Sequence, residues 1–109
     1  MAYKEVTSTG TDVTIFETPQ DKIYKIKGLV ITNGSANEAT VEIKDKYTYN
    51  LGSSSGSDGS RTLIKVTVDG NSERDLTELR GEEIIGTLVV NTDQQPIYVY
   101  VGLEEKEGW

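Results

Sequence analysis

Residues 52–56, with the sequence GSSSG, match the G-x-S-x-G pattern that surrounds the nucleophilic serine of many hydrolases. Such a serine needs a strand before it, a helix after it and a base that accepts its proton. The alternating run at 61–69 is typical of a second strand and not of a helix. The chain contains no histidine, and nothing in the sequence positions Lys46 or Lys65 as a substitute base. We therefore predict that this stretch is not a hydrolase active site.

The same glycines do not match a phosphate-binding loop. That loop requires a lysine after its last glycine, whereas serine follows both Gly56 and Gly59 here. Glycine and serine with a single aspartate are typical of a flexible connection. We interpret residues 52–60 as a flexible loop that only joins the strands on either side of it.

Metal and cofactor chemistry also lacks its usual residues. Because the chain has neither cysteine nor histidine, it has no thiolate zinc site, no cysteine nucleophile and no imidazole ligand. Loop aspartates could ligate calcium, but they do not follow the D-x-[DN]-x-[DN]-G series, and scattered aspartates usually form turns. These aspartates are Asp45, Asp58, Asp69, Asp75 and Asp93. We predict no catalytic residue, no cofactor and no metal site, and therefore no enzyme.

Two short segments bear on processing. Asn33-Gly34-Ser35 matches the N-x-[ST] glycosylation sequon, but Asn-Gly is also a strong signal for a hairpin turn. The first residues, Met1–Glu5, contain no apolar segment of the kind that a signal peptide requires. We interpret the Asn33 segment as a turn and expect synthesis without a signal peptide. The location stays open, with a virus particle among the settings considered.

The net charge bears on the choice of partner. The formal charge is −7 at neutral pH, so on average the protein repels nucleic-acid backbones and anionic membranes. No segment has the apolar length of a membrane-spanning helix. We therefore expect neither a nucleic acid nor a membrane as partner.

The elements that must position any site are strands. Apolar and polar residues alternate in runs rich in valine, isoleucine, threonine and tyrosine, separated by turn residues. We predict strands near 2–7, 11–17, 22–32, 39–50, 61–69, 83–90 and 96–103, and a single helical turn at Leu76–Leu79 stays open. About seven or eight short antiparallel strands predict an all-β, jelly-roll-like β-sandwich forming a single domain over residues 1–109. A small closed barrel is the alternative. Residues 103–109 are expected to form an acidic tail.

Apolar residues on both faces of a strand indicate that something covers the second face. Ile23–Ile31, Ile84–Val90 and Ile97–Val101 show this pattern, although an outer strand of a sandwich needs only one apolar face. A loop of the same chain, a second copy of the chain or a ligand could supply the cover, and we expect a second copy. The predicted interface consists of Tyr24, Ile26, Val30, Ile85, Val89, Tyr98 and Tyr100, with Trp109 as a docking anchor at the end of the chain.

The order of strands and turns resembles that of small virion proteins of tailed phages and related viruses. The resemblance rests on Gly28–Asn33, a polar turn and Ala39–Ile43, and on Leu79–Ile85 followed by Val89–Asn91 and Ile97–Val101. Such head-decoration, neck and tail proteins are often β-sandwich domains that assemble as rings or trimers and perform no chemistry. The resemblance implies a non-enzymatic structural protein, a trimer or dimer, with other virion proteins as further partners.

A carbohydrate-binding module is the alternative function. Tyrosines two residues apart on a strand point to the same side and present aromatic rings on which a sugar can stack. Tyr98 with Tyr100, or Tyr47 with Tyr49, would form this platform.

Overall fold

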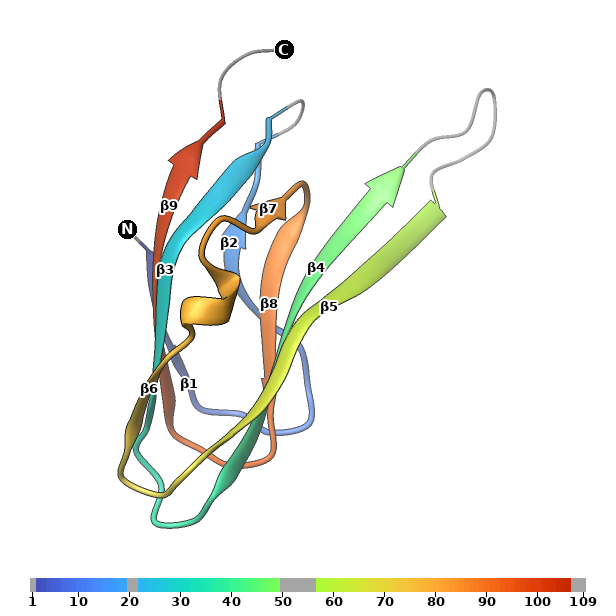
Figure 1. The fold of residues 1–109 in the computed structure, drawn as a ribbon. Coiled ribbons are helices and arrows are strands. Elements are labelled where there is room, and N and C mark those ends of the chain that lie inside the picture. Colours follow the sequence, from blue (N-terminus) through green and yellow to red (C-terminus); the bar gives the residue numbers. More distant parts are fainter. Residues whose placement is uncertain (1, 20–21, 50–56, 107–109) are drawn as a thin grey trace.

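The computed structural model describes residues 2–19, 22–49 and 57–106, which form two antiparallel sheets packed face to face (Figure 1). Sheet A has the strand order β1-β9-β3-β6, with β7 beside β3, and sheet B has the order β2-β8-β4-β5. Apart from the pairs β4–β5 and β6–β7, strands that follow one another in the sequence alternate between the five-stranded sheet A and the four-stranded sheet B, as in a jelly roll. The predicted all-β sandwich with jelly-roll topology is therefore confirmed, and the barrel alternative is wrong.

Most strands overlap the predicted ranges, but the predicted strand at 83–90 is divided into two strands that belong to different sheets, and the strand at 73–75 was not predicted. Sheet A contains β1 (Ala2–Val6), β9 (Ile97–Glu105), β3 (Tyr24–Asn33), β6 (Glu73–Asp75) and β7 (Glu83–Ile84). Sheet B contains β2 (Val13–Glu17), β8 (Thr87–Thr92), β4 (Ala39–Tyr49) and β5 (Ser57–Val68). The open segment at Leu76–Leu79 contains the 3₁₀ turn η1 (Thr77–Leu79), and the side chains of Leu76 and Leu79 are both buried.

The core lies between the inner faces of the sheets. Leu29 and Ile31 of β3 face Val41 and Ile43 of β4 in one continuous apolar cluster, and all four side chains are fully buried. These residues alternate with exposed or half-buried neighbours, as expected for strands that bury one face. Each of them contributes roughly 1.5–3 kcal/mol by its burial.

The β4–β5 hairpin extends beyond the sandwich (Figure 1). Pairing between β4 and β8 ends at Lys46, whereas β4 and β5 continue to pair as far as Tyr49 and Ser57. Residues 57–60 of the predicted loop therefore belong to a strand, and 52–56 lie outside the described residues. Gly59 has a packing role, since an added Cβ would lie 2.6 Å from the ring of Tyr47.

The predicted acidic tail also begins inside a strand. Glu104 and Glu105 belong to β9. Glu104 forms an ion pair with Lys27, and Glu105 forms one with Lys22, each with a nitrogen–oxygen distance of 2.9 Å. Residues 107–109, including the predicted anchor Trp109, lie outside the described residues.

The Asn33 segment joins β3 to β4, as a predicted turn should, but it is not a hairpin turn, because the two strands lie in different sheets. The Asn33 amide is fully buried and donates to the carbonyl oxygens of Asn37 (2.8 Å) and Val68 (3.0 Å). Its side-chain oxygen accepts from the backbone N–H and the hydroxyl of Ser35. This side chain therefore ties the β3–β4 turn to the end of β5.

Candidate functional site: the outer face of sheet A

Directly paired residues of antiparallel strands point to the same side of a sheet. Tyr3 of β1 pairs with Tyr100 of β9, and Tyr100 pairs in turn with Val30 of β3. Tyr98 lies on the same outward side, two residues from Tyr100 along β9. We call the set Tyr3, Val30, Tyr98 and Tyr100 the tyrosine face.

The tyrosine face exposes much of its apolar surface. Tyr3 is 51% exposed and Tyr100 is 42% exposed, and their ring centroids lie 4.6 Å apart with the planes tilted by 38°. Tyr98 is half-buried, because its ring packs so closely against Gly34 that an added Cβ there would lie 2.9 Å away. Two of the three large apolar side chains that are exposed among the described residues therefore touch each other on this face.

Partial loss of water affects the hydroxyl of Tyr3. This desolvation raises the pKa of Tyr3 above its ordinary value, and the nearby Tyr100 and Glu5 raise it further. Because each of these causes opposes a negative charge on the phenol, Tyr3 stays neutral well above neutral pH.

A bare patch lies next to the tyrosines on the same two strands. Gly28 of β3 pairs with Gly102 of β9, one outward row beyond the row of Val30 and Tyr100. An added Cβ would meet nothing within 4 Å at Gly28, and at Gly102 its nearest neighbour would be the Cβ of Lys27 at 3.8 Å, so the side chain of Lys27 borders the patch. We call the pair the glycine hollow, because two tall side chains stand directly beside two positions without any.

Charged residues flank the tyrosine face at opposite ends. Beyond the tyrosines lie Glu5 of β1 and Glu73 of β6, and Glu73 accepts a hydrogen bond from the hydroxyl of Thr32 at 3.2 Å. Beyond the glycine hollow lies Lys25 of β3, which is directly opposite Glu104 of β9 in the strand register. Glu104 forms its ion pair with Lys27. Across the described residues Lys25 forms no salt bridge, although its field contributes to the lowered pKa of Glu104.

The outer face of sheet B is built differently. Asp12, just before β2, accepts from Lys44 and Lys46 at 2.9 Å each and from the Asn91 amide at 3.0 Å. These hydrogen bonds, Asn91 first and then Lys46 and Lys44, hold the pKa of Asp12 well below its usual range. We call Asp12, Lys44, Lys46 and Asn91 the Asp12 network.

Val89 lies beneath the Asp12 network. It points outward from β8 and pairs with Lys44 of β4, yet it is only 3% exposed. Aliphatic stems of lysine cover neighbouring apolar surface while the ammonium groups reach water. The second apolar face of β8 is therefore covered by this chain's own side chains.

The structure thus divides the predicted interface into separate regions. Val30, Tyr98 and Tyr100 lie together on the outer face of sheet A. Val89 lies on the opposite sheet, and Ile85 is 53% exposed on the turn between β7 and β8.

The placement of Tyr24 and Ile26 in the interface was wrong. Ile26 is fully buried in the core, and Tyr24 packs against the core with its ring 5.0 Å from that of Phe16. The reason is a β-bulge at Lys27, where β3 holds one residue more than β9. The extra residue reverses the alternation of inward and outward side chains. Even-numbered residues such as Ile26 therefore face the core before Lys27, and odd-numbered residues such as Leu29 face it afterwards.

Sequence reasoning missed Tyr3. Its signal was present, because Val6 is the strongly apolar residue of the β1 segment and residues at odd spacing from it point outward. The pairing of Tyr3 with Tyr100, at opposite ends of the chain, was not visible in the sequence.

Two of the five aspartates considered as calcium ligands accept hydrogen bonds from the backbone. Asp45 is 1% exposed and accepts from the backbone N–H groups of Ile85 (3.1 Å) and Gly86 (2.9 Å). Asp93 accepts from the N–H of Thr40 at 2.8 Å. No cluster of three or more potential metal ligands occurs among residues 2–19, 22–49 and 57–106.

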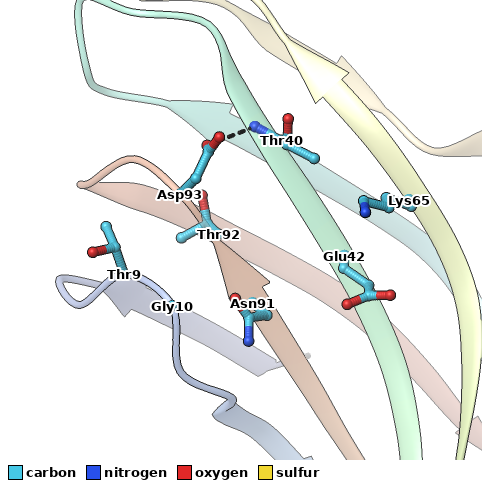
Figure 2. Close-up of a pocket in the computed structure, with 8 residues that line it drawn as sticks. All are labelled: Thr9, Gly10, Thr40, Glu42, Lys65, Asn91, Thr92 and Asp93. Atoms are coloured by element: carbon cyan, nitrogen blue, oxygen red, sulfur yellow. Dashed lines mark hydrogen bonds between the residues drawn. The ribbon is translucent and has the colours of Figure 1, made fainter.

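An open groove on sheet B is polar and largely satisfied by internal hydrogen bonds (Figure 2). Its volume is about 480 Å³, and Figure 2 shows the hydrogen bond from Thr40 to Asp93 across its upper end. Glu42 accepts from Thr62, and Asn91 belongs to the Asp12 network. The groove is lined by Thr9, Gly10, Thr40, Glu42, Lys65, Asn91, Thr92 and Asp93.

Comparison with known protein families, curated proteins and solved structures finds no match to this chain. Within the described part of the chain, no helix is long and apolar enough to cross a membrane.

Proposed function

We propose that this protein is a non-enzymatic structural module that associates with copies of itself through the tyrosine face. The observation that carries the proposal is the contact between Tyr3 and Tyr100, two exposed rings that meet at a tilt on the outer face of sheet A. Aromatic residues are enriched at protein interfaces, because they bury a large area at low entropic cost.

The sheet edges support contact through a face instead of strand addition. β5, the longest edge strand, has a bulge at Leu63 and carries Arg61 and Lys65. β2 has a bulge at Ile15, and β6 has only three residues. Bulges, charges and short length all hinder edge-to-edge pairing.

We further propose that the module works within a larger particle, such as a virion, with neighbouring structural proteins as additional partners. The strand-and-turn resemblance to decoration, neck and tail proteins supports this setting. A domain that contributes one modest contact surface suits a particle in which many copies act together.

Substitution of Tyr100 tests the proposed interface. Tyr100→Lys places a charge in the centre of the tyrosine face and should weaken self-association at least tenfold, as loss of a central aromatic anchor does. Ile85→Lys is the matched control, because Ile85 is similarly exposed but lies away from this face. Sedimentation velocity across micromolar concentrations measures association, and circular dichroism verifies folding. A wild-type protein that stays monomeric at high micromolar concentration overturns the proposal.

Carbohydrate binding is the second candidate, because Tyr98 and Tyr100 do share an outward face. Their neighbours Glu5, Thr32 and Glu73 offer polar groups of the kind that bind sugar hydroxyls. A glycan array distinguishes the candidates. Selective binding that is lost in both Tyr98→Ala and Tyr100→Ala would favour a sugar ligand over self-association.

A further inference from the structure

We infer that two copies pack their tyrosine faces together about a two-fold axis, so that Tyr100 of each copy fills the glycine hollow of the other. The axis runs across the strands, midway between the row of Tyr100 and the row of Gly102. This inference rests on the proposed self-association and specifies its geometry and its partner, which is a second copy of the chain.

The shape of the face is the first argument for a two-fold arrangement. A two-fold interface uses the same patch on both copies, so each protruding group must meet a depression of the same patch. The tyrosine row and the glycine hollow are adjacent outward rows on β3 and β9, about 6.8 Å apart. Rotation about the axis exchanges these rows, placing Tyr100 over Gly102 and Val30 over Gly28.

The charges at the two ends of the face are the second argument for this arrangement. The same rotation keeps each strand over its own partner, so Lys25 of β3 lies over Thr32, Glu104 of β9 over Tyr98, and Glu83 of β7 over Glu73 of β6. Glu104 and Glu83 form ion pairs with Lys27 and Lys106 of their own chain, which leaves Lys25 as the charge of this row that forms no salt bridge within the described part of the chain. Among the described residues neither Lys25 nor Glu73 forms a salt bridge within its own chain, so both charges are available. The end that carries the unpaired Lys25 therefore meets the partner's end that carries the unpaired Glu73, twice in one dimer.

The size of the face sets the strength of the contact. Four strands about 4.8 Å apart and four outward rows about 6.8 Å apart give on the order of 400 Å² per copy. That area lies below the range of stable complexes and near that of transient ones. We expect a reversible dimer with a dissociation constant in the micromolar range or weaker, which repeated contacts in a particle would strengthen.

Filling the hollow tests the geometry. Gly102→Val adds a side chain where the free protein has space, since the nearest atom to an added Cβ is 3.8 Å away. The variant should fold normally and lose at least tenfold in association, because the partner's Tyr100 no longer fits. Thr67→Val, on an exposed position of β5, is the control for the added apolar surface and should associate like the wild type.

Charge exchange tests the orientation. Lys25→Glu and Glu73→Lys should each weaken association about fivefold, because like charges then meet at both ends, each contact being modest as rim charges are. An equimolar mixture of the two variants should restore association, since every end contact is again between opposite charges. Sedimentation velocity measures all samples at low ionic strength, where screening is weak.

The outcomes separate this inference from the proposed function. Loss of association in Gly102→Val together with recovery in the charge mixture supports the two-fold arrangement. Suppose that Tyr100→Lys abolishes association, but Gly102→Val associates like the wild type and the mixture associates no better than either charge variant alone. The face is then correct and the two-fold arrangement is overturned. A wild-type protein that never associates overturns both.

Discussion

Val89 and Val30 lie on central strands of opposite sheets, and both point away from the core. Val89 is almost fully buried beneath the Asp12 network, whereas Val30 is half-buried beside the exposed Tyr100. The difference shows that an outward apolar residue does not by itself indicate a partner. What decides is whether the chain supplies long charged side chains to cover it.

The largest effect is expected from placing the same polar group at these two positions. Val89→Asn buries an amide beneath the lysine stems without a matched partner and should lower the free energy of unfolding by about 2–3 kcal/mol. Val30→Asn leaves the amide near water and should cost less than about 1 kcal/mol. Urea unfolding of both variants measures the difference, and equal losses would show that the two faces are covered alike.

The Asp12 network can be removed without touching Val89. Asp12→Asn retains the size of the side chain but removes the charge that three donors share, and should lower stability at neutral pH by about 1–2 kcal/mol. Lys65→Gln, on the same sheet but in no ion pair among the described residues, is the control and should have little effect. An unchanged stability in Asp12→Asn would show that the Asp12 network does not contribute to the stability of the fold.

The same carboxylate predicts how stability responds to acid. The folded pKa of Asp12 lies below its unfolded value, so its contribution is complete above about pH 4 and is lost as the pH falls toward the folded value. Wild-type stability should therefore fall more steeply below pH 4 than that of Asp12→Asn. Glu83 and Glu104, whose pKa values are also lowered by lysine partners, give both proteins a common background. Parallel curves would contradict the role of Asp12.

Much of the fold followed from alternation of apolar and polar residues. The positions of the core strands β3, β4 and β9 could be predicted, because buried and outward residues alternate over most of each strand. Two local departures could not be. The bulge at Lys27 reverses the alternation without a marker beyond the neighbouring Gly28, and pairing with β4 extends β5 into a glycine- and serine-rich segment.

The candidate site was only partly predictable, for a reason that concerns distance along the chain. Tyr98 and Tyr100 could be identified together, because they are two residues apart on one strand. Their contact with Tyr3 and the cover that Asp12 gives Val89 join segments from opposite ends of the chain. Such contacts depend on strand order, which local patterns do not determine.

The smallest predicted effect concerns alkaline pH and the tyrosine face. Desolvation and the neighbouring Tyr100 and Glu5 raise the pKa of Tyr3, so the folded protein favours the neutral phenol. Contact with a second copy removes more water and favours the neutral form further, so association should weaken as the pH rises above about 10.

Tyr3→Phe isolates this contribution, because it retains the ring that stacks on Tyr100 but removes the ionising group. At pH 8 the variant should associate like the wild type, since the hydroxyl is neutral there. Between pH 9 and 11 the wild type should lose roughly two- to threefold more affinity than the variant, because one added charge near the rim of an interface has a modest effect. Sedimentation velocity across this range measures the loss, with circular dichroism at each pH to establish that the sandwich stays folded. A variant that loses affinity as steeply as the wild type would mean that Tyr3 lies outside the contact. The interface would then have to be centred on Val30 and Tyr100 alone.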